Sequence, residues 1–370
     1  MNILLAIIVI NIVILTHEFG HYVFAKWHGC GVLEFSIGLG PKIYSFRKQE
    51  TLFCLRLFPV LGYVSIYGED DANEKSKDDK DSKDNKEALL IIDKENIHKL
   101  VDLPLLKRLS ILLGGVFFNI ILAILLCYSL VIFKGVPSFD LTIYDTIHNS
   151  PAQLAGLKSQ DKIIAIQGKR VDSVAQFIQI VNEPINQPIM LTILRNQEIK
   201  KISVKSKYDE KQKKRMIGIH FETVLTFNRK GVNSFDYLVG GTRLVWRQTE
   251  TTFQVLSGLF SRKVALNELS GVVGVVGITS KVIGMGSIST LFLLLSLINV
   301  NLAIINALPL PLLDGFACVI ALIEGVIRKK ISMKIKQALQ YAGIIFFAGL
   351  FIFITFFDIQ RLFFDIWRAK

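Results

Sequence analysis

Two histidines and a glutamate lie within the first apolar stretch of the chain, in the pentad His17-Glu18-Phe19-Gly20-His21. Residues four positions apart face the same side of a helix, so both imidazoles can reach one metal ion. The pattern HExxH is typical of zinc hydrolases, in which the glutamate accepts a proton from water. Ionisable groups at membrane depth are costly, which favours a functional role over a packing role. We therefore predict zinc ligands at His17 and His21 and a catalytic base at Glu18.

A second group with suitable chemistry is the sequence NALPLPLLDG at residues 306–315. Pro309 and Pro311 cannot sit inside a regular helix, so we expect the apolar span to break here. Broken helices at membrane depth usually line a site. The Asp314 carboxylate could complete a set of three protein ligands and leave the fourth zinc position open for water. A surface turn just outside the membrane is the alternative for this segment taken alone.

The composition is that of a membrane protein with a folded aqueous part. Of the 370 residues, 51% are hydrophobic, and the mean hydropathy is +0.45. The net charge of +12 does not indicate a nucleic-acid partner, because no basic stripe is interleaved with aromatic residues. Excess Lys and Arg is expected in the cytoplasmic loops of membrane proteins. The four cysteines have neither metal-clip nor disulfide spacing.

Four apolar stretches are long enough to cross a hydrocarbon core of about 30 Å. We expect a multi-span α-helical membrane protein, with about four transmembrane helices, a membrane-associated β segment and an inserted α/β domain. The expected segments are a first span with HExxH at residues 1–28, the β segment at 29–68, a charged insert and interfacial segment at 69–104, a second span at 105–134, the α/β domain at 136–223, an amphipathic region at 224–287, a third span at 288–323 and a fourth at 341–366.

Lys and Arg near the span ends predict the orientation. None precedes the first span, whereas basic residues follow it, precede the second span and separate the third from the fourth. Such clusters mark the cytoplasmic side of a membrane. We therefore expect both termini and the α/β domain outside the cell membrane, and the catalytic motif toward the cytoplasmic side.

The β segment follows directly on the helix that carries the histidines. Residues 31–68 hold β-like runs separated by glycines and prolines. An extended segment here could dip into the membrane and bind substrate by strand addition, which makes Gly62 and Tyr63 candidates for substrate contact. A small cytoplasmic hairpin is the alternative. The charged run at residues 69–87 is expected to be a disordered, solvated tether.

The outer region carries its own motif. The pattern SPAxxAGLxxxDxIxxIxGxxV, which begins at Ser150, resembles a PDZ domain. Such domains bind extended C-termini or strands at a sheet edge. The resemblance implies an outer-face peptide ligand. The alternative is a domain that only packs as a steric cover over the membrane site.

Together, HEFGH, FSIGLGP at residues 35–41, GGVFFN at residues 114–119, the PDZ pattern and NALPLPLLDG resemble the site-2 protease family. They are most similar to its bacterial branch, the regulators of sigma-E proteases, over nearly the whole chain. The resemblance implies a zinc endopeptidase of the bacterial inner membrane that cuts single-span membrane proteins in regulated intramembrane proteolysis. Anti-sigma factors and signal-peptide remnants are examples of such substrates. It assigns the zinc to His17, His21 and Asp314, proton transfer to Glu18 and substrate contact to Asn306. We also expect Pro309 and Pro311, in the broken segment, to contact substrate.

Two other classes of function remain open. A non-catalytic PDZ receptor would bind outer-face peptides and would need neither Glu18 nor Asp314. A metal transporter would carry ligands on several helices along a path, whereas here they gather in two motifs and no repeat symmetry is present. Among these classes we expect the protease, with the lipid bilayer and single-span membrane proteins as its partners.

Overall fold

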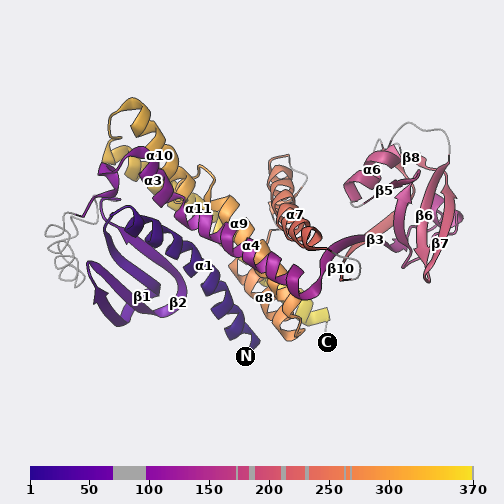
Figure 1. Ribbon diagram of the computed structural model, residues 1–370, viewed down its shortest axis with the longest axis horizontal. Helices are drawn as coiled ribbons and strands as arrows, with labels where there is room; N and C mark the ends of the chain where they lie inside the picture. The colour runs from indigo at the N-terminus through magenta and orange to yellow at the C-terminus, as the bar shows by residue number, and fades with distance from the viewer. Residues whose placement is uncertain are drawn as a thin grey trace. The chain divides into compact units, whose positions relative to one another are not determined.

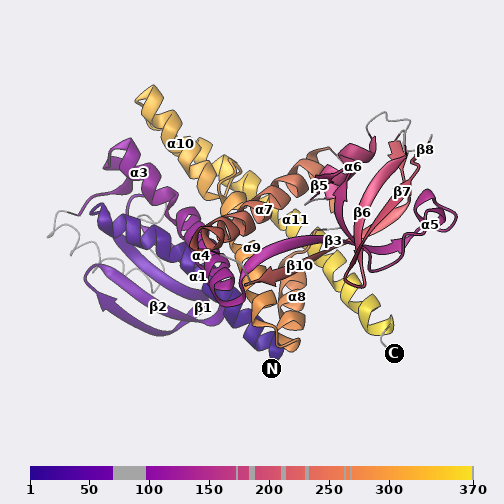
Figure 2. The ribbon, with the colours of Figure 1, turned by 45° about the vertical axis from the view of Figure 1, so that its right-hand side comes forward.

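The computed structural model describes residues 1–69, 97–171, 174–182, 188–209, 214–229, 233–261, 264–266 and 269–368. The chain forms two compact units, one made of Met1–Leu130 with Gly241–Lys370 and the other of Val131–Gly240. The expected tether at residues 69–87 falls almost entirely outside the described residues. Figures 1 and 2 show helices and one long hairpin in the first unit, and a sheet with short helices in the second.

Apolar helices make up most of the first unit. They are α1 (Asn2–Trp27), α3 (Leu105–Leu112), α4 (Gly114–Lys134), α7 (Ser234–Phe260), α8 (Val272–Gly284), α9 (Ile288–Asn306), α10 (Asp314–Ile327) and α11 (Met333–Arg368), with a short 3₁₀ turn η1 (Leu100–Asp102). Within the described ranges, α1, α4, α9 and the part Met333–Arg361 of α11 are long and apolar enough to cross a membrane. The expectation of a multi-span protein with about four such helices is therefore confirmed.

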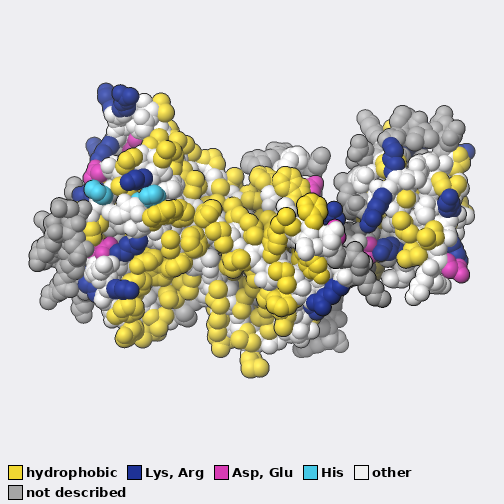
Figure 3. All heavy atoms as spheres, in the orientation of Figure 1, with side chains coloured by type: hydrophobic (Ala, Val, Ile, Leu, Met, Phe, Trp, Pro, Cys, Tyr) yellow, Lys and Arg dark blue, Asp and Glu magenta, His cyan; other side chains and the backbone are white. Residues whose placement is uncertain are grey.

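The surface of these helices has the character that a bilayer requires. Large apolar side chains such as Ile12, Leu125 and Ile345 are exposed, and Figure 3 shows hydrophobic side chains covering much of the visible face. A water-soluble protein rarely exposes apolar area on this scale, whereas lipid tails solvate it.

The β segment is a hairpin whose two strands pair in separate short runs, as the sequence indicated: residues 32–37 pair with 62–66, and residues 42–48 pair with 51–56. Strands β1 (Val32–Lys48) and β2 (Thr51–Ile66) pair antiparallel and lie beside α1 in both ribbon views (Figures 1 and 2). At the turn, the buried Glu50 carboxylate forms an ion pair with Lys26 near the end of α1. Tyr22 of α1 packs edge-on against Phe35, with ring centroids 5.7 Å apart. These contacts fix the hairpin against the helix that carries the histidines.

A buried apolar cluster holds the other elements around the same end of α1. It joins the end of α1, the base of the hairpin, the η1 turn, α3 and α10, through Ala25, Cys30, Val32, Ile66, Leu100, Leu103, Ile111, Leu112, Cys318 and Ala321. Because packed cores resist displacement, this cluster fixes α10 relative to α1.

The expected break lies between α9 and α10. Residues 307–313 are not helical, Leu312 has a φ of 75°, and Asp314 is the first residue of α10. A Cβ on Gly315 would lie 2.3 Å from the carbonyl oxygen of Ala307, so the tight return of the chain requires glycine there. The break thus places a carboxylate at the start of a new helix.

The second unit is an α/β domain. Its main sheet has the order β10-β3-β4-β6-β7, with β5 paired to β4. The elements are β3 (Val136–Thr146), α5 (Pro151–Leu154), β4 (Lys162–Ile166), β5 (Lys169–Arg170), α6 (Val174–Asn182), β6 (Ile189–Arg195), β7 (Glu198–Val204) and β10 (Ile219–Asn228), and a separate ladder of β8 (Lys207–Asp209) and β9 (Lys214–Met216). Ser150 caps α5 by accepting the Gln153 N–H, with Pro151 at the first helical position. The strands and short helices that the PDZ pattern predicts are thus present.

Candidate metal centre

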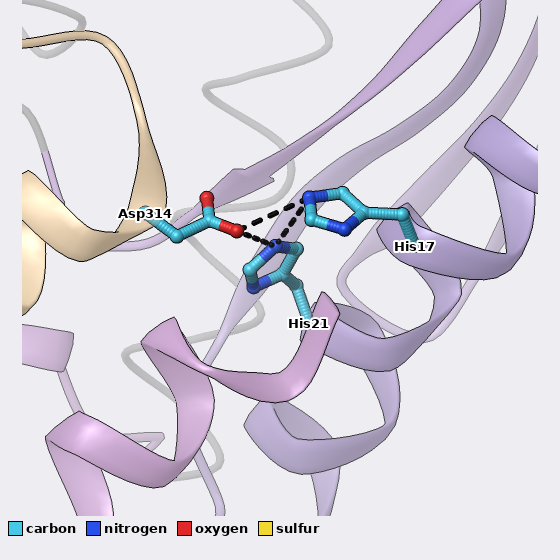
Figure 4. A group of neighbouring side chains, drawn as sticks. All are labelled: His17, His21 and Asp314. Atoms are coloured by element: carbon cyan, nitrogen blue, oxygen red, sulfur yellow. Dashed lines mark hydrogen bonds and ion pairs between the residues drawn. The ribbon is translucent and has the colours of Figure 1, made fainter. Parts of the chain in front are cut away.

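His17, His21 and Asp314 meet in one place. The two histidines lie one turn apart on α1, with 6% and 8% of their surface exposed, and Asp314 approaches them from the start of α10 (Figure 4). The Nε2 atoms are 3.3 Å apart. Oδ2 of Asp314 lies 3.2 Å from Nε2 of His17 and 3.4 Å from Nε2 of His21. Three donor atoms therefore form a nearly equilateral triangle.

The triangle fits a zinc ion. Tetrahedral zinc with nitrogen and oxygen ligands at about 2.0–2.1 Å separates its donors by about 3.3–3.4 Å, which is the spacing found here. Oδ2 of Asp314 is buried and receives no hydrogen bond of ordinary geometry from the described residues, while the two imidazole nitrogens lie 3.2 and 3.4 Å away. Two imidazoles and one carboxylate are ligands that catalytic zinc commonly uses, with a fourth position left open. This cluster is also the one group of metal-ligand type that the described ranges contain.

Atoms behind the histidines hold their outer ring nitrogens. Nδ1 of His21 lies 2.9 Å from the carbonyl oxygen of Ile111, at the end of α3. Nδ1 of His17 lies 3.1 Å from the side-chain amide of Asn119 on α4. Metal-binding histidines generally have such partners, which set the tautomer and the ring orientation.

The glycine pair of α4 makes room for the imidazoles. A Cβ on Gly115 would lie 2.4 Å from Nε2 of His21 and 2.6 Å from Cε1 of His17. No side chain can occupy that volume while both rings keep their positions. The backbone of α4 therefore lies directly against one side of the cluster.

Glu18 lies beside the cluster, in a cavity of about 310 Å³ that His21 and Asp314 also line. The backbone N–H of Val64 in β2 points at its carboxylate. A Cβ on Gly62 would lie 3.9 Å from Cγ of Glu18. A larger groove of about 530 Å³ runs along α7, but it contains none of these residues. We regard the smaller cavity as the candidate site, because the Glu18 carboxylate lines it together with His21 and Asp314 of the cluster.

The residues predicted to contact substrate have different surroundings. The Asn306 amide lies 3.1 Å from Nε2 of His17, and Gly62 lies against Glu18. Pro309 is exposed in the break, whereas Pro311 packs against Gly343 of α11. The structure therefore brings Asn306 and Gly62 to the cluster, and the two prolines shape the segment that carries Asp314.

The Tyr63 hydroxyl belongs to a polar network inside the hairpin. It donates to Oε1 of Glu34 at 2.8 Å, and Arg56 binds the same oxygen at 2.7 Å. Burial first, and then the negative charge of Glu34, raise the pKa of the Tyr63 hydroxyl, so it stays protonated. This network stiffens the strand next to Glu18. The Tyr63 hydroxyl already has its hydrogen-bond partners within the network.

Sequence reasoning gave no role to the groups behind the histidines. Asn119 and Gly115 were noted within the GGVFFN segment, but their contacts with His17 and His21 span about a hundred positions. An asparagine within an apolar span was the available signal, since polar residues at membrane depth usually have a partner. The carbonyl of Ile111 leaves no signal, because every residue has one.

Comparisons with known proteins cover almost the whole chain. Residues 5–350 match the model of the family described as "Peptidase family M50". "Zinc metalloprotease RasP" of Oceanobacillus iheyensis is 30% identical, over 96% of this chain and 98% of the relative. "Regulator of sigma-W protease RasP" of Bacillus subtilis is 28% identical, over 96% and 98% respectively. "Probable protease eep" of Enterococcus faecalis is 29% identical, over 97% and 98%.

Two similar solved structures each match a part of the chain. The PDZ domain of the SdrC-like protein Lmo2051 from Listeria monocytogenes is 18% identical, with a TM-score of 0.21 over 22% of this chain and 85% of that domain. The second domain of the Listeria protein Lin2157 is 16% identical, with a TM-score of 0.19 over 26% of this chain and 91% of that domain.

Proposed function

This chain belongs to peptidase family M50, and we propose that it hydrolyses peptide bonds in or near the membrane-spanning segment of single-span membrane proteins. It is a zinc metalloprotease and a multi-span membrane protein, as the family match and the apolar helices show. The finer points proposed here are the site residues, the class of substrate, the place of the cut and the orientation in the bacterial inner membrane.

One observation carries the proposal. The triangle of His17, His21 and Asp314 is built on α1 and α10, and α1 is itself long and apolar enough to span a membrane. A hydrolytic zinc site on such a helix acts on peptide bonds at membrane depth. We therefore assign the zinc to these three residues, in agreement with the tetrahedral spacing of their donor atoms.

Glu18 is the proposed general base. A zinc ion at the triangle would polarise the scissile carbonyl and activate the attacking water. The Glu18 carboxylate lies beside the triangle, where it can take the proton of that water and pass it to the leaving amine. The N–H of Val64 in β2 would help to orient this carboxylate for both transfers.

The strand next to Glu18 is the proposed substrate platform. A helical peptide has its backbone groups paired internally and must be extended before a carbonyl can be attacked. Residues 62–66 of β2 pair with β1, and Gly62 and Val64 adjoin Glu18. An extended substrate could add as a strand along the edge of residues 62–66 that does not pair with β1. Asn306, at the other side of His17, would hold the substrate at the cut.

Basic residues support the orientation. Lys26 lies in the last turn of α1, Lys107 lies in α3, and Arg328 to Lys330 lie between α10 and α11. On the positive-inside rule these ends face the cytoplasm, so the termini and the α/β unit would face outward. The α/β unit is then available to an outer-face peptide. A relative named regulator of sigma-W protease supports an anti-sigma factor as one substrate.

The proposal is tested with protein purified in detergent and a single-span substrate tagged at both ends. We expect cleavage within the span, its loss on chelation and its return with zinc. Glu18→Gln should bind zinc as the wild type does and fail to cleave, because only the proton acceptor is removed. A Glu18→Gln protein of full activity would contradict the assigned base. A receptor or transporter would show no cleavage in any of these samples.

A further inference from the structure

Asn119 is an unusual residue for its position. It lies in the first third of the apolar helix α4, and none of its surface is exposed. Its amide nitrogen Nδ2 lies 3.1 Å from Nδ1 of His17, and its Oδ1 has no hydrogen-bond partner in the described part of the chain. Burying an acceptor without a donor destabilises the fold, so its retention needs a reason.

The placement of the zinc ligands determines which hydrogen His17 must carry. Nε2 of His17 faces Asp314 and His21, so it is the nitrogen that would bind the metal. A ligating nitrogen needs its lone pair, and the neutral ring then carries its hydrogen on Nδ1. Nδ1–H is a donor, and it requires an acceptor rather than another N–H.

Asn119 supplies that acceptor once its amide is turned by half a rotation. The oxygen and nitrogen of an asparagine amide have nearly the same shape, and their assignment follows from the hydrogen bonds around them. With Oδ1 facing Nδ1 of His17, the unpaired oxygen gains a donor and the Nδ1–H gains an acceptor. The same logic already holds at His21, whose Nδ1 faces the Ile111 carbonyl, a group that can only accept.

We propose that Asn119 is a positioning residue that accepts the Nδ1–H of His17 through Oδ1 and thereby fixes the tautomer and ring orientation that zinc binding needs. The proposal rests on the ligand set assigned above. On this proposal α3 and α4 have the same role, because each presents one hydrogen-bond acceptor to the Nδ1 atom of one histidine ligand. Groups in this position typically change metal affinity by roughly 10–100-fold when they are removed.

The test compares two replacements of Asn119 in the full-length protein. Asn119→Asp keeps an acceptor of the same size, whereas Asn119→Leu keeps the approximate volume and removes all polar atoms. Asn299→Leu is the matched control. Asn299 is equally buried in the apolar helix α9, its Oδ1 has no partner among the described residues, and its amide donates to the Leu295 carbonyl of its own helix. Zinc affinity is measured by competition with a fluorescent chelator, and folding by size-exclusion chromatography.

We expect Asn119→Leu to lower zinc affinity by roughly 10–100-fold, and Asn119→Asp and Asn299→Leu to remain within a few-fold of the wild type. Wild-type affinity in Asn119→Leu would overturn the proposal, and so would a folded Asn119→Asp protein that has lost zinc. If Asn119→Leu does not fold, the Asn119→Asp result decides.

A His17→Ala protein separates this proposal from the assignment of the site. If His17→Ala still binds zinc, the ligand set is wrong. If it loses zinc while Asn119→Leu keeps it, only the role of Asn119 fails.

Discussion

Gly20 and Gly114 bring the backbones of α1 and α4 into direct contact. A Cβ on Gly20 would lie 2.2 Å from the carbonyl oxygen of Gly114, and one on Gly114 would lie 2.6 Å from the carbonyl oxygen of Gly20. Small residues commonly allow such close crossings between membrane helices. Gly20 lies between the two histidines in sequence, so the crossing sets α4 directly against both rings.

Replacing the next glycine of α4 should remove zinc without unfolding the protein. In Gly115→Ala the new methyl group would meet the rings of His17 and His21 at 2.4–2.7 Å, so the rings must move out of the triangle. We expect zinc affinity to fall at least about tenfold, as measured by chelator competition. Gly349→Ala in α11 is the control, since a Cβ there would meet no other part of the described chain within 4 Å. Equal zinc affinity in the two variants would argue against this close contact between α4 and the imidazole rings.

Removing the carboxylate should be as damaging as removing a histidine. Asp314→Ala leaves two imidazoles and opens the third corner of the triangle. We expect less than one zinc per protein by elemental analysis, and no cleavage even in excess zinc. A full zinc complement in Asp314→Ala would show that another residue supplies the third ligand.

A buried carboxylate connects α8 to α11. Oδ2 of Asp358 accepts the N–H groups of Gly271 and Gly274 at 2.9 and 2.8 Å, at the start of α8, which also packs on α1. Asp358→Ala leaves both donors unpaired, so the free energy of unfolding in detergent should fall by about 1–3 kcal/mol. Asp358→Asn keeps one acceptor oxygen and should lose less. Identical stability of the wild type and the alanine variant would contradict this connection.

The reactivity of the Cys54 thiol depends on how tightly the hairpin is packed around it. Burial first, and then the charge of Glu34, raise the pKa of Cys54 from 9.0 to about 12. Only the thiolate reacts, so in a variant with Cys54 as its sole cysteine the alkylation rate should rise about tenfold per pH unit between pH 8 and 10. The unfolded protein should approach a plateau above pH 9. A plateau near pH 9 in the folded protein would show that Cys54 is solvated.

Local sequence was enough to predict the individual parts of the site. The spacing of His17 and His21 follows from helix geometry alone, and the prolines at 309 and 311 prevent a continuous helix whatever surrounds them. The PDZ pattern likewise indicated short elements that the second unit contains, because capping and turn residues act over a few positions. The hairpin was less predictable, since strand pairing depends on partners distant in the sequence.

The sequence by itself determined the chemistry of the chain: a zinc-type histidine pair with a glutamate between them, a carboxylate at a broken helix, and spans that require a bilayer. Tertiary structure alone decided which backbone passes close enough to hold that chemistry in place. Ile111, Gly115 and Asn119 reach the histidines from about ninety to a hundred positions away, through a helix crossing at Gly20 and Gly114. Such contacts depend on how whole helices pack, and no local pattern of residue types encodes that packing.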